Sequence, residues 1–437
     1  MASDSVLFVS SDRAGASPSA LPILVGLYFG FRLFIMVLSV RLLGTDPRAG
    51  TALDLSVDYL FLALVAFGTL GAPRMPLREM TRLASVRWAS LFLAFTGASL
   101  IWSSTASLPT SFAYWCAMAS DAAIVVLLVR AEPLTTVSSA LMKGYVWGAC
   151  LVAGIAWIMP AQSDLRLGDE ELLGANQIGY LCAFAFFIAQ YLVREKKEPF
   201  VIQAGFLAVT LLRTLSKTTI VAFLLSQGFL LIRDKSISRK SKAFIALAAA
   251  AVVTASWSLL SSYYAIYSSA GDQSTTLTGR IGIWAYILAE AVQQPWIGHG
   301  FDSVWKVIPP FGSDQFEAAH AHNEILQQFY AYGLAGICLF AGIHSSIFRH
   351  IRRLAKGPSR TFFLAFLIFI LVRGVADTER FDLSFPMWAI ILFSLLIEQG
   401  RIEQQEAPDI LALQPPPLAA LPQNFSVVDV GPRNSEV

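Results

Sequence analysis

The sequence predicts an all-α polytopic membrane protein with about twelve transmembrane helices and one large loop outside the membrane. Of its 437 residues, 55% are hydrophobic and only 14% are charged, whereas soluble domains carry roughly 25% charged residues. The hydrophobic residues gather in runs of about 20, the length that an α-helix needs to cross the hydrocarbon core of a bilayer. All four cysteines lie inside these runs, so they predict neither a disulfide framework nor a metal site.

The twelve predicted spans cover residues 21–41, 53–71, 88–104, 111–129, 135–159, 175–193, 200–213, 216–232, 243–264, 323–348, 361–375 and 385–398. The loops after even-numbered spans hold 18 Lys and Arg, and the loops after odd-numbered spans hold 5. Because cytoplasmic loops are enriched in Lys and Arg, we expect both termini to be cytoplasmic. The longest loop then faces outward, which is the periplasm in a Gram-negative bacterium.

This orientation divides the chain into five regions. They are a cytoplasmic N-terminal tail (1–20), transmembrane helices 1–9 (21–264), a large periplasmic loop with a short amphipathic helix (265–322), transmembrane helices 10–12 (323–398) and a Pro-rich, disordered cytoplasmic tail (399–437). The expected location is the bacterial inner membrane.

Three ionisable residues are predicted at membrane depth: Arg32, Asp58 and Asp121. An ionisable side chain there costs several kcal/mol, so each is a candidate functional residue. An intramembrane ion pair that fixes helix packing, for example Arg32 with Asp58, is the simpler interpretation.

Several polar residues lie at outward span ends. Arg213 and Lys217 flank one tight outer turn, where they are suited either to bind phosphate oxygens or to extend to the interface. The scarcity of outer cations favours the first interpretation. Arg373 and Arg380 lie near another outer end, and Asn176 opens the sixth span, where its amide can contact a sugar or phosphate or cap the helix.

The outward loop contains a short amphipathic run that we expect to begin near Gly279 and Arg280, capped by Thr278. The helix dipole disfavours a cation in a first turn, so Arg280 is expected to have an anionic partner. His320 and His322 precede the tenth span, and histidine can accept a hydroxyl proton near neutral pH. A capping or hydrogen-bonding role is the alternative, and an HxH pair without cysteine or a helical acidic pair is a weak metal signal.

These residues resemble a known signature. The chain has, in order, Arg280, Trp284, Pro295, Gly298 and Gly300, then Ala321, His322, Asn323 and Leu326, then Gly333 and Gly336. This order resembles the O-antigen ligase and polysaccharide polymerase superfamily. The segments LSKTT (215–219) and GANQIGYL (174–181) are similar to two further segments of that family. The resemblance covers residues 170–350, and the first five spans agree only in topology.

The resemblance implies a C-type glycosyltransferase fold and an inverting, metal-independent enzyme without a cofactor. Such enzymes transfer a glycan from a polyprenyl diphosphate to a hydroxyl of another repeat, of the lipid A core or, in some members, of a protein. It assigns the base to His322 and the diphosphate contacts to Arg280 and Lys217, with Arg213 beside them. Lys217 stands where many members have Arg. The lysine keeps the positive charge but loses the bidentate hydrogen bonding of a guanidinium.

Further contacts and partners are also expected. Asn323 is expected to orient the imidazole or a sugar, and further substrate contacts are expected from Asn176, His320, Arg373 and Arg380. The expected partners are a polyprenyl-diphosphate-linked oligosaccharide, membrane lipids, a chain-length regulator and export machinery; nothing indicates nucleic acid.

Three functions remain open on the sequence alone. The SKT variant and the short outer loop favour a polymerase of a secreted polysaccharide. A ligase that transfers glycan to the lipid A core is the first alternative. A polyprenyl-glycan flippase or other transporter is the alternative from another class.

Overall fold

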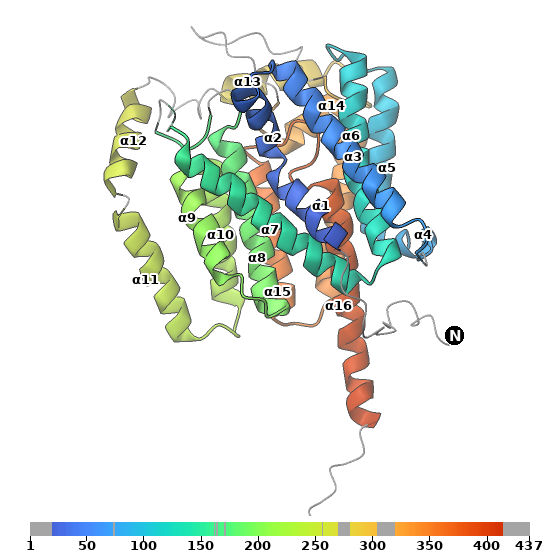
Figure 1. Ribbon diagram of the computed structural model, residues 1–437, viewed down its shortest axis with the longest axis vertical. Helices are drawn as coiled ribbons and strands as arrows, with labels where there is room; N and C mark the ends of the chain where they lie inside the picture. Colours follow the sequence, from blue (N-terminus) through green and yellow to red (C-terminus); the bar gives the residue numbers. More distant parts are fainter. Residues whose placement is uncertain are drawn as a thin grey trace, which may run out of the picture.

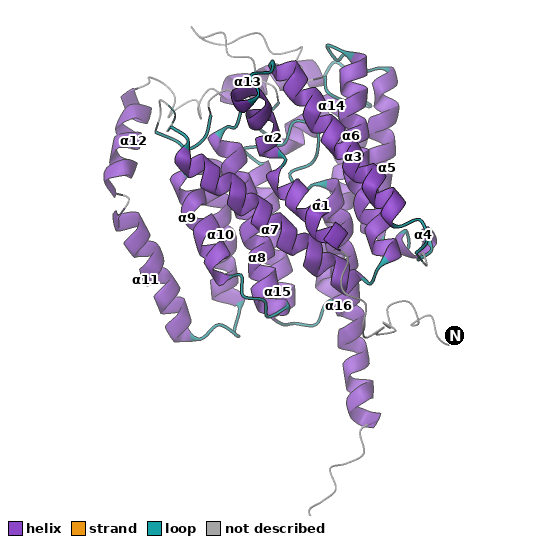
Figure 2. Cartoon of the chain, viewed as in Figure 1, coloured by secondary structure: helices purple, strands orange, loops and turns teal. Residues whose placement is uncertain are grey.

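The computed structural model describes residues 20–72, 75–160, 162, 165–169, 172–255, 257–269, 280–303 and 320–413. Within these ranges the chain is helical, with loops between the helices and no strand (Figure 1; Figure 2). The first part holds α1 (Ala20–Phe31), α2 (Leu33–Val37), the π-helix η2 (Leu38–Leu42), α3 (Pro47–Gly68), α4 (Leu77–Met80), α5 (Ala84–Ala98), the 3-10 turn η3 (Ser99–Ile101), α6 (Leu108–Ala131), α7 (Leu134–Ile158) and α8 (Ala175–Glu195). The second holds α9 (Val201–Arg213), α10 (Lys217–Arg233), α11 (Arg239–Ala255), α12 (Trp257–Ser269), α13 (Arg280–Ala291), α14 (Glu324–Arg353), α15 (Pro358–Gly374) and α16 (Met387–Leu413).

The prediction of a multi-pass, all-helical membrane protein is confirmed. Six helical segments within the described ranges (α3, α5 with η3, α6, α7, α8 and α14) are long and apolar enough to cross a membrane, and the bent pair of α1 with α2–η2 makes seven. Each of the twelve predicted spans coincides with helical residues. The count of twelve stays a prediction, since α9, α10 and α15 have only 13, 17 and 17 residues.

Most successive helices run in alternating directions, with α1–α2 and α11–α12 each continuing in one direction, so the connections gather largely at two opposite ends of the bundle (Figure 1). The upper end in the figure holds the η2–α3, α9–α10 and α15–α16 connections, together with α13 and the start of α14. We call this the site end. Helix α13 begins at Arg280, as the amphipathic pattern predicted; its expected cap, Thr278, lies outside the described residues.

Helices α1 and α7 cross very closely because glycines lie on both sides of their contact. A Cβ atom added to Gly26 or to Gly144 would lie only 2.0 Å from a backbone oxygen of the other helix. Gly30 and Gly148, each four residues further along its helix, are as tightly enclosed, with 2.3 and 2.4 Å to the opposing backbone. Small residues at this spacing let two membrane helices approach until their backbones touch, which is a main source of helix association in lipid.

The ionisable residues at membrane depth pair differently from the interpretation that joined Arg32 to Asp58. The guanidinium of Arg32 forms its ion pair with Asp121 of α6, and Asp58 instead accepts a hydrogen bond from the Tyr28 hydroxyl at 3.2 Å. Arg32 stands at the break between α1 and α2, where the chain bends by 58°. The sequence could not reveal this bend, and with it the partner of Arg32.

The tail that was predicted to be cytoplasmic and disordered from residue 399 is helical as far as Leu413, where α16 extends beyond the other helices (Figure 1). Charged and amide side chains stabilise its first exposed turns: Arg401 pairs with Glu398 at 2.6 Å, three residues before it. That prediction is therefore wrong for this stretch. Residues 414–437 lie outside the described part of the chain.

Candidate active site

The turn that carries His322 lies immediately before helix α14. Asn323 caps this helix, since its Oδ1 accepts a hydrogen bond from the N–H of Leu326 at 3.0 Å. The N–H of Ala321 donates to the side chain of Gln327 at 2.8 Å and holds the turn from the other side. His322 has φ +49°, a conformation uncommon for a residue with a side chain. The helix start thus imposes the position of the histidine.

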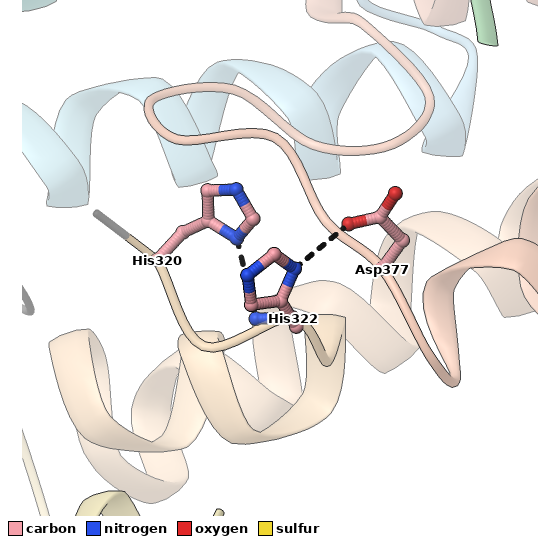
Figure 3. A group of neighbouring side chains, drawn as sticks. All are labelled: His320, His322 and Asp377. Atoms are coloured by element: carbon pink, nitrogen blue, oxygen red, sulfur yellow. Dashed lines mark hydrogen bonds and ion pairs between the residues drawn. The ribbon is translucent and has the colours of Figure 1, made fainter. Parts of the chain in front are cut away.

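His322 forms a dyad with Asp377 of the α15–α16 loop (Figure 3). Its Nδ1 lies 3.3 Å from Oδ1 of Asp377, and the two side chains are 17% and 3% exposed. Burial by itself would raise the pKa of Asp377, but the charge of Arg373 and the hydrogen bond with His322 outweigh burial and hold that pKa below its ordinary value. Asp377 is therefore ionised, which favours the tautomer with the proton on Nδ1 of His322 and leaves Nε2 to accept a proton.

His320 supports the same turn. Its Nδ1 accepts a hydrogen bond from the backbone N–H of His322 at 3.3 Å, and the two rings meet edge to face at 4.1 Å (Figure 3). Burial, followed by the charge of His322, lowers the pKa of His320 to about 3, so this ring is neutral at physiological pH. Ligand atoms of His320, His322 and Asp377 all lie within 4.8 Å of one another, a spacing that also suits a metal ion. Nδ1 of His320 already accepts from the His322 N–H, and Oδ2 of Asp377 accepts from Arg373.

Arg280, the first residue of α13, joins three elements of the site. Its guanidinium donates to the Thr218 hydroxyl at 2.9 Å and to the backbone carbonyl of Ala376, which adjoins Asp377. One turn further along α13, the indole N–H of Trp284 donates to the carbonyl of Ala321 at 3.0 Å. The amphipathic helix thereby places a cation between the start of α10 and the loop that holds the histidine.

Lys217 begins α10, next to the Thr218 that Arg280 contacts. Its Nζ lies 5.5 Å from the ring centre of Tyr263, a cation–π distance. The preceding Ser216 donates its hydroxyl proton to Oδ1 of Asn176 at 2.9 Å, so Asn176 holds the start of α10 in place. Asn176 therefore fixes the residue that directly precedes Lys217.

Arg213 does not join this group. Its guanidinium donates to the backbone carbonyl of Leu165 at 2.6 Å, on the α7–α8 connection. Leu215, between the two cations of this turn, has φ +55° and reverses the chain direction there. Arg213 thus contacts the α7–α8 connection, whereas Lys217 contacts Tyr263 of α12.

Arg373 lies inside the protein, where it positions Asp377. Its side chain is 2% exposed and contacts the carboxylates of Asp377 at 3.4 Å and Glu379 at 2.8 Å. Its guanidinium also lies 3.9 Å from the centre of the Tyr180 ring. Such burial leaves no surface for a substrate, so its expected direct contact with substrate does not fit this geometry.

Arg380 and Asn323 complete the predicted group. Arg380 lies on the same loop as Asp377 and pairs with Asp302 at 3.7 Å. The side-chain amide of Asn323 donates to the carbonyl of Val375 at 2.8 Å, so both of its polar atoms serve the backbone. Asn323 fixes the turn, and none of its hydrogen bonds reaches the imidazole.

Sequence reasoning missed the roles of two residues of the site, Asp377 and Glu324, whereas Thr218 lies in the LSKTT segment that the resemblance singled out. Glu324 is buried at the start of α14, where it accepts hydrogen bonds from Thr378 at 2.9 Å and from the Ser384 N–H at 3.0 Å, which ties α14 to the α15–α16 loop. The run of charges just after the eleventh predicted span was the available signal for Asp377.

The fold and the site together define a class of protein. It is a multi-pass membrane protein with a histidine–carboxylate dyad and a cation at one end of its helices. Residues 202–341 match the family model described as O-antigen ligase. An O-antigen ligase of Pseudomonas aeruginosa (strain PAO1 and equivalents) is 27% identical over 137 residues, which are 30% of this chain and 33% of that protein. The matched part thus spans about a third of the relative. These matches confirm the resemblance to the O-antigen ligase and polysaccharide polymerase superfamily, and neither points to a carrier.

The family match includes Lys217, Arg280 and His322, but ends before Asp377 and Arg380. The part of the site that contains Asp377 and Arg380 is therefore supported by geometry alone.

Proposed function

We propose that the chain is a membrane glycosyltransferase that polymerises polyprenyl-diphosphate-linked oligosaccharide repeats into a secreted exopolysaccharide or O-antigen at the periplasmic face. The observation that carries the proposal is that one short loop binds both halves of the site. Its Ala376 carbonyl accepts from Arg280, and its Asp377 carboxylate pairs with His322. A cation for the leaving group and a base for the nucleophile are thus anchored on adjacent residues.

The diphosphate of the donor binds at the start of α10. Arg280 contacts the Thr218 hydroxyl there, Lys217 is the first residue of α10, and the positive end of the α10 dipole adds to their attraction for an anion. As the sugar–phosphate bond breaks, negative charge grows on the diphosphate oxygens, so these groups bind the transition state more tightly than the ground state. A diphosphate is already a good leaving group, and charge stabilisation therefore carries much of the rate enhancement.

The acceptor is activated by His322. Its Nε2 takes the proton of the acceptor hydroxyl while the hydroxyl oxygen bonds to the anomeric carbon. The bond from that carbon to the phosphate oxygen breaks, and polyprenyl diphosphate leaves with the electron pair. The imidazolium that forms is stabilised by ionised Asp377, 3.3 Å away. Attack from the face opposite the leaving group inverts the anomeric centre, and base catalysis of this kind contributes about 10²–10⁴-fold. The chemistry requires no metal or cofactor.

Ligation to the lipid A core is the second candidate, because the curated relative is named an O-antigen ligase. The two functions share the donor, the base and the diphosphate site, and differ only in the hydroxyl that attacks.

Deletion of the gene followed by analysis of lipid-linked glycans separates the candidates. The proposal predicts single, unpolymerised repeats on the lipid carrier. Full-length polymer on the carrier beside bare lipid A core indicates the ligase, and loss of repeats from the outer leaflet contradicts both. In the complemented strain, His322→Ala and Arg280→Ala should reproduce the deletion while accumulating normally in the membrane. An active His322→Ala variant beside an inactive His320→Ala variant would assign the base to His320.

A further inference from the structure

A second group of polar and aromatic side chains lies beyond Asp377 along the same loop. Asp302 accepts a hydrogen bond from the Ser111 hydroxyl at 2.8 Å and lies 3.7 Å from the Arg380 guanidinium. That guanidinium lies 4.7 Å from the centre of the Phe381 ring, which stacks on Tyr114 with 4.0 Å between ring centres. We call Asp302, Arg380, Phe381 and Tyr114 the second cluster. The side chains of Asp302 and Arg380 are 10% and 34% exposed, so the cluster reaches the surface through the arginine.

The turn that precedes Asp302 is fixed by several close contacts. Gly300 has φ +89°, and a Cβ atom there would lie 2.5 Å from the Cα of Ser103, so only glycine fits. The next residue, Phe301, donates its N–H to Ser99 at 3.0 Å and accepts from the Ser103 hydroxyl at 2.5 Å. Asp302 follows with φ +56°, in the left-handed region that Asp adopts more readily than most residues with a side chain.

The order of contacts along the α15–α16 loop relates this cluster to the base. Ala376 accepts from Arg280, Asp377 pairs with His322, and Arg380 pairs with Asp302. Along this loop the dyad therefore stands between the diphosphate cation and the second cluster. In an inverting displacement the nucleophile and the leaving group lie on opposite sides of the reacting carbon. The acceptor is therefore expected on the side of the dyad away from Arg280, and the second cluster is the group that follows the dyad along the loop.

We propose that the second cluster is the subsite for the acceptor sugar, the one whose hydroxyl attacks. This inference rests on the proposed glycosyl transfer and names the residues that recognise its second substrate. Asp302 accepts hydrogen bonds from sugar hydroxyls and Arg380 donates to ring or hydroxyl oxygens, which suits a sugar ring and leaves the diphosphate to Arg280. The aromatic pair of Phe381 and Tyr114 supports the guanidinium in place.

The test is steady-state kinetics of the full-length protein in lipid nanodiscs, with a synthetic polyprenyl-diphosphate repeat as donor and a soluble oligosaccharide of the same repeat as acceptor. For Asp302→Asn we expect the KM for the acceptor to rise about tenfold or more, while the KM for the donor moves less than twofold. The matched control is Glu198→Gln, which makes the same acid-to-amide change in an ion pair with Lys143 far from this loop. It should alter neither constant.

Equal rises in both KM values, or no rise for the acceptor, would overturn the assignment. Should Asp302→Asn fail to accumulate, Arg380→Gln gives the same readout at a more exposed side chain, and Arg380→Lys should restore part of the acceptor affinity. A wild-type protein that transfers no glycan at all refutes the proposed function. A wild type that transfers glycan, with variants that bind acceptor normally, refutes only this subsite.

Discussion

Replacing Asp377 with asparagine removes one charge from the dyad while keeping its shape. The carboxylate lies 3.3 Å from Nδ1 of His322, and two unit charges at that distance interact by about 5 kcal/mol at an effective dielectric constant of about 20. This attraction exists only once the imidazole has taken the acceptor proton, so it lowers the barrier and leaves substrate binding unchanged. Asp377→Asn should therefore lower kcat by about 10²–10⁴-fold, with little change in the KM for the donor.

The assay is release of polyprenyl diphosphate by purified variants under saturating donor. Arg373 keeps its 2.8 Å contact with Glu379 in this variant, so the protein should still fold. Glu379→Gln is the matched control: it removes the other carboxylate of Arg373 without touching His322, and should keep activity within about threefold of wild type. If Asp377→Asn retains more than a tenth of the wild-type kcat, the dyad does not operate as described.

Three further predictions concern charge, packing and pH. Arg280→Gln should lower kcat about 10²–10³-fold and Arg280→Lys less, in the same release assay; equal losses would exclude a charge effect. Gly144→Val should lower the thermal unfolding midpoint in detergent, because its Cβ would meet a backbone oxygen at 2.0 Å, whereas Gly154→Val on the same helix, with nothing within 4 Å, should not. His320 has its pKa lowered from 6.5 to about 3, so below pH 6.5 the unfolded state binds a proton that the folded state does not. Its contribution to stability is full above pH 6.5 and about 2 kcal/mol smaller at pH 5; the midpoint of His320→Gln should fall less between pH 7 and 5 than that of wild type.

The helical membrane architecture could be predicted from hydrophobicity because lipid leaves the backbone few alternatives. The start of α13 at Arg280 also follows from local signals, whereas Asn323, expected to orient the imidazole or a sugar, caps α14. Local signals did not reveal the break at Arg32 or its partner. The guanidinium of Arg32 pairs with Asp121, 89 residues away in the chain, and a local pattern does not predict a contact over that separation.

The residues of the candidate site likewise fall into two groups: those that local sequence predicts and those that only the tertiary structure reveals. The motif identified His322 and Arg280, but the partner of the histidine lies 55 residues further along the chain, among several charges that looked equivalent. Arg373 resembled a substrate contact because it stands at an outward helix end, yet burial directs it to Asp377. Arg213 and Lys217 looked like a pair at four residues' spacing, but the turn at Leu215 separates their contacts. In each case the tertiary contact decided the role.

We propose that His322 activates a hydroxyl for glycosyl transfer from a polyprenyl diphosphate. The decisive experiment incubates the purified protein in nanodiscs with a synthetic lipid-linked repeat and measures elongated glycan and released polyprenyl diphosphate together. Wild type should release one polyprenyl diphosphate for each new glycosidic bond, and His322→Ala should produce less than a hundredth of each. Full activity in His322→Ala, or no coupled release by wild type, would contradict the claim.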